Sequence, residues 1–244
     1  MERKKSLGQC FLEDRNILAL EAKLAQPQGR TVLEIGPGDG RLTEAVLALG
    51  PKKMIAVEKD SRFASLLREK FAGKAEIIEG DFLKVEPPAC DIVIGNIPYY
   101  ISSDIVFSIA PLKLERAVLM VQKEFAQKMV AEPGEKNYGR LSVTAQTAFE
   151  VKLERIVPRH LFRPIPKVDS AIIVLTPTGI KLDRYQEDVI RSLFSHRNKL
   201  VRGALMDSGF EPAELEGLGA FKERRVRTLT KEECMEIARI LKNL

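Results

Sequence analysis

Residues 33–43, LEIGPGDGRLT, lead from a β-type apolar run through three glycines into a helical pattern. The glycines let the backbone turn sharply and let a ligand approach the main chain, and the following helix directs its first N–H groups at the same place. A glycine turn between a strand and a helix is typical of nucleotide-type binding loops in α/β folds. We therefore expect Gly36, Gly38 and Gly40 to contact a cofactor.

The spacing of these glycines distinguishes among nucleotide ligands. The dinucleotide fingerprint GxGxxG requires glycine at position 41, where this chain has Arg41. Glu58 ends the next apolar run, and a carboxylate there can accept both hydrogen bonds from a ribose diol. The pattern disfavours NAD and favours an adenosine ligand without a pyrophosphate.

The surrounding sequence predicts the fold. Apolar runs at 31–36, 53–58, 75–80, 91–96 and 117–122 are each expected to precede a helix, which is the rhythm of a parallel sheet covered by helices. Two more runs, 151–158 and 170–177, have a proline-rich connection and predict an antiparallel addition at the sheet edge. The expected fold class is α/β, with a Rossmann-like seven-strand sheet.

A second domain is expected at the C-terminal end. Residues 176–182, TPTGIKL, have the composition of a linker. From Asp183 the pattern is helical in period, with breaks at SGFEP and around Gly217 and Gly219. We therefore expect one domain over 1–180 and a small all-α domain of about four helices over 181–244.

Composition narrows the class of protein but does not choose the partner. A net charge of +5 fits a polyanionic ligand, yet 30% charged residues of both signs equally fit an ordinary solvated surface. Three scattered cysteines and two isolated histidines predict neither disulfides nor a metal site, and favour a reduced, cytoplasmic compartment. With no run of about 18 apolar residues, we expect neither export nor a membrane span.

Two further segments at strand ends carry polar chemistry. Asp81 follows the third run, where its carboxylate can accept a hydrogen bond from an adenine amino group, while Phe82 either lies against the ring or packs in the core. The fourth run ends in NIPYY, in which Pro98 forces Ile97 into an extended conformation. The Asn96 amide oxygen and the Ile97 carbonyl then form a pair of acceptors suited to an amino group. An isolated NIPYY would more often be a plain turn; its place in the same sheet as the glycine loop favours a site.

These motifs, in this order, resemble the rRNA adenine dimethyltransferases of the KsgA family, which methylate two adjacent adenosines near the 3′ end of small-subunit rRNA. The resemblance covers nearly the whole chain. It rests on KKSLGQCFL, LEIGPGDGRLT, VEKD, GDFL, NIPYYISS, QKEFAQKM, YGRLSV, FRPIPKVDSAIIVL and LFSHRNKLVRGAL. It implies a methyltransferase that uses S-adenosylmethionine, acts on rRNA within a pre-ribosomal particle, and serves small-subunit biogenesis. We expect a monomer, although the sequence does not reveal the oligomeric state.

The resemblance also implies roles for individual residues. The segment from Gln9 to Leu12 would close over the methionine end of the cofactor, Glu58 would hold the ribose, and Asp81 would contact the adenine. The family usually has asparagine or histidine where this chain has Cys10, so a backbone contact is expected there. The implied cofactor contacts are Gln9, Cys10, Leu12, Gly36, Gly38, Gly40, Glu58, Lys59, Asp81, Phe82 and Asn96.

The catalytic residues expected from this reading form a tetrad of Asn96, Ile97, Pro98 and Tyr99. Accepting both hydrogen bonds of the adenine amine favours a pyramidal nitrogen whose lone pair points at the cofactor methyl. Tyr99 offers a face on which an extruded base stacks, worth about 1–3 kcal/mol in comparable sites. Transfer from a sulfonium makes the amine acidic, so positioning is expected to supply most of the catalysis without a strong base.

Contacts to RNA are expected from basic and aromatic residues outside the cofactor loop. Tyr138 and Arg140 are assigned by family analogy alone. The cluster from Arg197 to Arg202 fits phosphate binding and a solvated helix about equally well. The expected RNA contacts are Tyr138, Arg140, Lys167, Arg197, Lys199 and Arg202.

Three alternatives remain open from the sequence. Large-subunit rRNA methylases that confer antibiotic resistance share the NIPY motif and the loop, although FRPIPKVDSA with Lys167 is more similar to the small-subunit enzymes. A second class is a ribosome-assembly factor that binds pre-rRNA and whose methylation is dispensable. A DNA adenine methyltransferase is a third class, but it typically has two prolines in the tetrad, and Ile97 occupies the middle here.

Overall fold

The chain folds into two compact units, which are described separately. The structure is a computed structural model that describes residues 10–242. Within that range, the first unit contains the residues up to Ala126 together with Lys152–Pro177. The second contains Gln127–Val151 and the residues from Thr178 onward.

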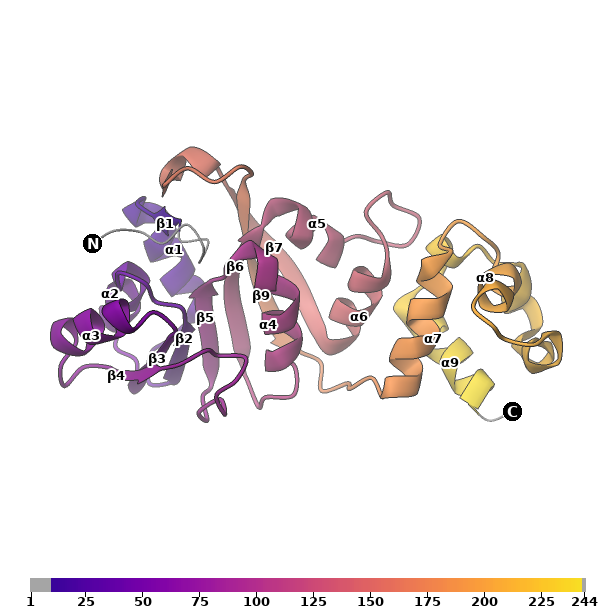
Figure 1. Ribbon diagram of the computed structural model, residues 1–244, viewed down its shortest axis with the longest axis horizontal. Coiled ribbons are helices and arrows are strands. Elements are labelled where there is room, and N and C mark those ends of the chain that lie inside the picture. The colour runs from indigo at the N-terminus through magenta and orange to yellow at the C-terminus, as the bar shows by residue number, and fades with distance from the viewer. Residues whose placement is uncertain (1–9, 243–244) are drawn as a thin grey trace. The chain divides into compact units, whose positions relative to one another are not determined.

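The first unit is built on a mixed sheet (Figure 1). Among the described residues its seven strands lie in the order β4-β3-β2-β5-β6-β9-β7. Neighbours from β4 to β6 pair in parallel, and β9 pairs antiparallel with β6, from Ala117 opposite Leu175 to Gln122 opposite Ser170. The expected seven-strand α/β sheet with an antiparallel edge addition is therefore confirmed. Its strands are β2 (Thr31–Ile35), β3 (Lys53–Glu58), β4 (Glu76–Glu79), β5 (Ile92–Asn96), β6 (Arg116–Gln122), β7 (Phe149–Val157) and β9 (Ser170–Pro177).

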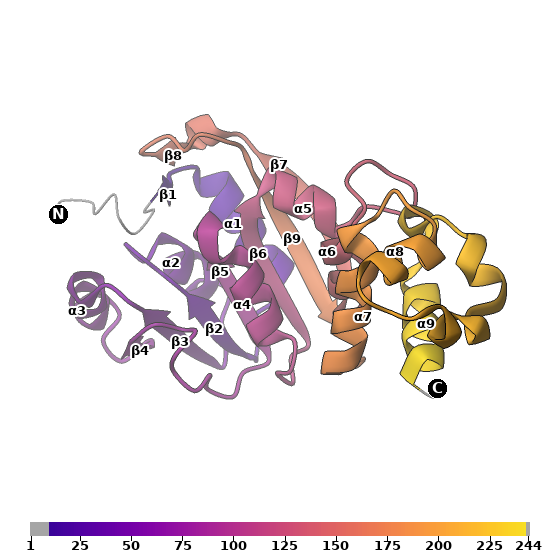
Figure 2. The same ribbon diagram turned by 45° about the vertical axis from the view of Figure 1, so that its right-hand side comes forward.

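Helices cover both faces of this sheet (Figure 2). On one face α1 (Arg15–Ala25) and α2 (Arg41–Leu47) pack against alternate strand residues such as Val32, Ile92 and Ile94, and α4 (Ser102–Ile109) lies on the other face. The alternation follows from the pleat, which turns every second side chain to the same face. Helix α3 (Ser61–Lys70) follows β3, and α5 (Lys123–Met129) follows β6.

One expected helix is not formed. Between β4 and β5, residues 80–91 form turns and irregular chain, so the expectation that every apolar run precedes a helix is wrong at this point. Pro87 and Pro88 lie next to each other in this connection. Proline lacks the N–H that a helix needs and disfavours helical geometry in the residue before it.

The strand order creates a switch point between β2 and β5. From β2 the chain proceeds outward to β3 and β4, and it then returns to β5 on the other side of β2. The two strands lie so close at Gly95 that an added Cβ would be 2.6 Å from the Ile35 carbonyl oxygen, so only glycine fits there. Open α/β sheets bind ligands outside the carboxyl ends of strands at such a point.

A short two-stranded sheet anchors the segment that precedes α1. Strand β1 (Phe11–Leu12) pairs antiparallel with β8 (Phe162–Arg163), and the Glu13 N–H donates to the Leu161 carbonyl at 2.9 Å. Asp14 then caps α1, because its side chain accepts from the N–H groups of Asn16 and Ile17. The chain on either side of β8 includes the short 3-10 helix η3 (Arg159–Leu161).

The second unit is helical and has its own apolar core. Residues Ala131, Tyr138 and Val143 pack with C-terminal residues such as Leu193 and Ile237. This packing explains why residues 127–151 belong with the helical unit. From the sequence we had expected them in a first domain that spans 1–180. Its elements are α6 (Arg140–Ala148), α7 (Arg184–Ser195), α8 (Val201–Asp207), η4 (Pro212–Glu223), η5 (Val226–Thr228) and α9 (Lys231–Lys242).

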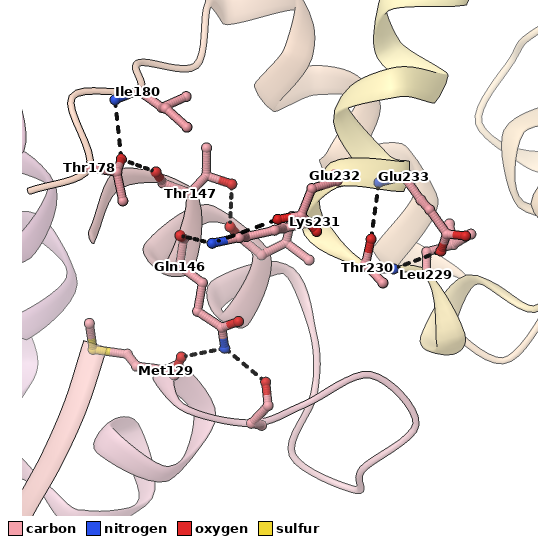
Figure 3. A network of polar contacts seen from close by, with 12 residues as sticks. Met129, Gln146, Thr147, Thr178, Ile180, Leu229, Thr230, Lys231, Glu232 and Glu233 are labelled. Carbon is pink, nitrogen blue, oxygen red and sulfur yellow. Dashed lines mark hydrogen bonds and ion pairs between the residues drawn. The ribbon is translucent and has the colours of Figure 1, made fainter. Parts of the chain in front are cut away.

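Polar contacts lie within and between the two segments of this unit (Figure 3). The Gln146 side chain donates to the carbonyls of Met129 and Ala131 at 2.9 and 2.8 Å, and the Gln146 carbonyl accepts from Lys231 Nζ at 2.8 Å. Thr230 and Glu233 cap the start of α9 reciprocally, each side chain accepting from the other's backbone N–H. The helical unit is thus held by specific hydrogen bonds as well as by its core.

Candidate active site

The glycine loop after β2 has the backbone that a tight ligand-binding turn requires. Gly36, Gly38 and Gly40 all have positive φ angles, of 66°, 57° and 79°. At Gly38 a Cβ atom would also lie 2.6 Å from the ring of Phe11, so the aromatic ring of β1 packs directly on the loop. Conformation disfavours side chains at all three positions, and lack of space also excludes them at Gly38 and Gly40. The main chain of the loop is therefore held beside Phe11, which belongs to the segment that we expected to close over the cofactor.

Glu58 connects the end of β3 with this loop. Its Oε2 accepts from the Gly38 N–H at 2.9 Å, and its Oε1 accepts from the Asp60 N–H at 2.8 Å. Burial raises the pKa of the Glu58 carboxyl, and the two backbone donors oppose that shift. A carboxylate held this way is a fixed acceptor at the strand end, as a ribose diol requires.

Asp81 lies beyond β4 and pairs with Lys59 from the loop after β3. The distance from Lys59 Nζ to Asp81 Oδ2 is 2.8 Å, and Asp81 Oδ1 accepts from the Leu83 N–H at 3.2 Å. The hydrogen bond from Lys59 lowers the pKa of Asp81, which keeps the carboxylate ionised and able to accept. Phe82 is only 6% exposed, so its ring packs mainly in the core.

The tetrad after β5 is fixed by backbone and side-chain hydrogen bonds. The Ile97 N–H donates to the Met120 carbonyl at 2.9 Å, and the Ile101 N–H donates to the Pro98 carbonyl at 3.1 Å. Tyr99 begins the 3-10 helix η2 (Tyr99–Ile101), and its hydroxyl is 2.7 Å from Ser170 Oγ. Burial raises the pKa of the Tyr99 hydroxyl, which stays neutral near pH 7. The Pro98 and Tyr99 carbonyls are used in this turn, because they accept from the N–H groups of Ile101 and Ser102.

Two buried carboxyls that the sequence analysis missed lie on the face of the sheet that α1 and α2 cover. Glu21 of α1 is fully buried, and Glu34 of β2 is 1% exposed. Glu34 accepts from Thr43 Oγ1 at 2.6 Å, and burial raises its pKa to about 8. The missed signal was a charge inside an apolar stripe, since Glu21 falls at helical spacing between Ile17 and Ala25.

The segment before α1 is represented in the structure from Cys10 onward. Gln9 lies outside the described residues. Leu12 is 3% exposed and Cys10 is half-buried against the same core, so any ligand contact by Leu12 falls to its backbone. The Leu12 carbonyl already accepts from the Arg41 guanidinium at 3.1 Å. These contacts fix the start of α1 beside the glycine loop.

Two of the residues expected to bind RNA have internal roles. Tyr138 is 1% exposed, and its hydroxyl donates to the Leu229 carbonyl at 2.6 Å. Arg197 donates to the carbonyls of Tyr138 and Lys136, each at 3.0 Å. Both side chains join residues 127–151 to the C-terminal helices. Burial leaves the Tyr138 ring without access to RNA, whereas contact of the partly exposed Arg197 with RNA stays a prediction. The exposed members of the expected set are Arg140, Lys167, Lys199 and Arg202.

Residues 10–242 contain neither a candidate metal centre nor a candidate membrane-spanning helix. No group of three or more histidine, cysteine or acidic side chains in that range is arranged to hold a metal ion. No helix of the same range has both the length and the apolar character to cross a membrane.

The fold and the site together define an α/β methyltransferase of class I topology. The chain belongs to the ribosomal RNA adenine dimethylase family, which it matches over residues 1–243. It is 42% identical over 255 residues to a probable ribosomal RNA small subunit methyltransferase A of Thermococcus onnurineus, covering 99% of this chain and 93% of that protein. The expected family and enzyme class are therefore confirmed.

Solved structures agree with this assignment. A dimethyladenosine transferase from Plasmodium falciparum superposes with a TM-score of 0.84 at 30% identity, covering 93% of this chain and 95% of that one. The 23S rRNA methyltransferase ErmE superposes with a TM-score of 0.73 at 31% identity, covering 95% and 99%. The large-subunit rRNA methylases, which were the competing class, thus share this fold. The fold therefore does not decide between small-subunit and large-subunit rRNA as the substrate.

Proposed function

We propose that this chain transfers methyl groups from S-adenosylmethionine to the exocyclic amines of two adjacent adenosines near the 3′ end of small-subunit rRNA. The observation that carries the proposal is the set of acceptors at one edge of the sheet. Glu58, Asp81 and Asn96 lie at or just after the ends of β3, β4 and β5, next to the glycine loop after β2. The name of the archaeal relative supports the small subunit as the source of the RNA.

The residues at this edge fit S-adenosylmethionine. At Gly36 nothing lies within 4 Å of the position that a Cβ would take, so the main chain is open to a ligand there, and the positive φ angles of all three loop glycines disfavour side chains. Glu58 would accept from the ribose hydroxyls, and Asp81 would accept from the adenine amine with Lys59 beside it. When bound, the cofactor supplies an electrophilic methyl group. The chain would contribute orientation and the exclusion of water.

The tetrad would hold the substrate base. The Asn96 Oδ1 and the Ile97 carbonyl would accept the two amine protons, and Tyr99 would stack against the ring. A monomethylated amine retains one proton and a lone pair, so a site that tolerates one methyl group allows a second transfer. The hydrogen bond of Tyr99 to Ser170 supports this role, because it fixes the aromatic ring from the side of β9.

The partner would be rRNA inside a pre-ribosomal particle in the cytoplasm, bound by a monomer that serves small-subunit biogenesis. The exposed side chains of Arg140, Lys199 and Arg202 in the helical unit would contact phosphates, as would Lys167 in the sheet unit. Lys199 also pairs with Asp207, so part of its charge is already neutralised. Arg140 and Arg202 are therefore the stronger candidates.

Transfer of label from methyl-labelled S-adenosylmethionine to purified ribosomal particles tests this proposal. Small-subunit particles and large-subunit particles are incubated separately with the protein, and the labelled position is mapped by primer extension. The proposal predicts label at two adjacent adenosines near the 3′ end of the small-subunit RNA. Label confined to large-subunit RNA would contradict it and assign the chain the activity of the competing class.

A further inference from the structure

Helix α1 has a carboxyl side chain in its buried stripe. The stripe consists of Ile17, Leu18, Glu21, Ala22 and Ala25, and Glu21 is 0% exposed. Burying a carboxyl group away from water is costly unless other groups in the protein hydrogen-bond to it. An apolar residue would fill the same position at lower cost. The presence of Glu21 therefore requires a reason in the groups that it contacts.

The group that Glu21 contacts is the side chain of Asn96. Along β5 the side chains of Ile92 and Ile94 point to the α1 face of the sheet, and the pleat directs Asn96 to the same face. The amide orientation that satisfies both groups places Asn96 Nδ2 2.9 Å from Glu21 Oε1 and 3.0 Å from Oε2. The first residue of the tetrad is therefore held from beneath by a helix of the same unit.

This contact decides which end of the amide faces the substrate. A carboxylate has acceptors only, so it takes the Nδ2 end of Asn96 and leaves the Oδ1 end directed away from α1. An adenine amine has two protons to donate and requires an acceptor. If the amide were turned over, two donors would meet at the reacting nitrogen.

We propose that Glu21 is a positioning residue for Asn96. The Glu21 carboxylate accepts from Asn96 Nδ2 and thereby holds Asn96 Oδ1 as the acceptor for the substrate amine. The proposal rests on the proposed transfer to the adenine amine and adds a residue that nothing in the motif pattern marks. Glu21 does not touch the reacting atoms and acts only through the orientation of the amide.

Charged neighbours make this orientation sensitive to pH. Burial raises the pKa of Glu21, and the nearby carboxyl of Glu34 on β2 raises it further. Glu34 is in turn influenced by Glu58 of β3 and by Asp39 of the loop, and it accepts from Thr43 of α2. A protonated Glu21 carries an O–H that can donate to Asn96 Oδ1 and permit the amide to turn over. Methyl transfer should therefore increase with pH as Glu21 loses its proton.

Two substitutions at Glu21 and one matched control test the proposal. Glu21→Gln retains the shape but can donate as well as accept, and Glu21→Leu continues the apolar stripe. Glu115→Gln is the same chemical change at an exposed side chain that pairs with Arg30. Glu115 directly precedes the first residue of β6, at the edge of the sheet opposite to Asn96. Single-turnover methyl transfer, cofactor affinity, RNA affinity and Tm are measured for each protein over a range of pH.

We expect both Glu21 variants to have a transfer rate about 10- to 100-fold lower, because small errors in the orientation of reacting groups reduce rates by such factors. The transfer rate of the variants should also no longer increase with pH. Cofactor and RNA affinities should stay within about twofold, and Glu115→Gln should behave as the wild type. A Glu21→Gln protein with the wild-type rate and pH profile, alongside an inactive Asn96→Ala protein, would overturn the positioning role alone. A wild-type protein without transfer to adenosine would instead overturn the proposed function.

A measurement on the wild-type protein covers the case in which a variant fails to fold. The side-chain amide resonances of Asn96 are followed by NMR together with the carboxyl carbon of Glu21. The proposal predicts that both change with one common midpoint of pH. An Asn96 amide that does not respond when Glu21 titrates would overturn it.

Discussion

Glu58 Oε2 accepts a hydrogen bond from the Gly38 N–H at 2.9 Å, so the strand-end carboxylate and the glycine loop form one rigid unit. Two segments far apart in the chain are thereby held in a single arrangement before any ligand binds. Preorganisation of this kind lowers the cost of ordering the site on binding. The relationship makes Glu58 a test of where the cofactor lies.

Replacing Glu58 by alanine should weaken binding of S-adenosylhomocysteine by about 10- to 100-fold, because hydrogen bonds to charged groups contribute about 1.5–3 kcal/mol. Calorimetric titration measures the change. Glu79→Gln is the control, because Glu79 is the register partner of Glu58 on β4 and its exposed carboxylate pairs with Arg68. Equal affinities for the Glu58→Ala and Glu79→Gln proteins would contradict the assignment of the ribose site.

Tyr138→Phe should lower the stability of the helical unit by about 1–3 kcal/mol, because the Leu229 carbonyl would lose its buried partner. RNA affinity should not change at temperatures where the variant is folded. Chemical denaturation and a binding titration separate the two effects. Tyr185→Phe, at a tyrosine packed less deeply against the same core, should cost less than about 0.5 kcal/mol. A loss of RNA affinity without a loss of stability would restore Tyr138 to the RNA surface.

Stability should depend on pH through Glu34. Its pKa is about 8 in the folded protein against an ordinary value of 4.5, so the folded state holds a proton that the unfolded state has lost between those values. The contribution of Glu34 to the free energy of unfolding is therefore largest below about pH 4.5 and falls as the pH rises toward 8. Glu34→Gln should reduce the difference in Tm between about pH 5.5 and about pH 8.5. An undiminished difference in the variant would contradict the assigned shift, and Glu115→Gln supplies the control.

The outline of the fold was predictable because its signals are local. Apolar runs ending in Gly36, Glu58 and Asn96 marked both the strands and the edge at which they place chemistry. The missing helix before β5 was also a local matter, since Pro87 and Pro88 are visible in the sequence. These features depend on a few neighbouring residues and on the common direction of parallel strands.

The parts that were missed depend on contacts between distant segments. Tyr138 and Arg197 donate hydrogen bonds to carbonyls that lie about 60 to 90 residues away in the chain. The residue type alone, basic or aromatic, does not predict such a distant partner. The position of Glu21 under Asn96 likewise requires α1 to pack on β5. A charge in an apolar stripe was the one visible indication of it.

Substitution of Arg140 or Arg202 by alanine should weaken RNA binding and reduce the slope of log affinity against log salt by about 1 each, because each removes about one phosphate contact. Fluorescence titrations over a range of salt concentrations measure both quantities. Arg239→Ala is the control, because this exposed arginine of α9 pairs with Glu236. Unchanged slopes for the Arg140 and Arg202 variants would remove both residues from the RNA surface.

The most direct test of the account is the dimethyladenosine content of small-subunit RNA after incubation with the wild-type or the Asn96→Ala protein. Nuclease digestion and mass spectrometry measure that content, and a parallel titration measures RNA binding. We expect two dimethylated adenosines per RNA with the wild type, and none with the variant, which should still bind the particle. Dimethylation by the Asn96→Ala protein at a rate near that of the wild type would contradict the role of the tetrad and the account built on it.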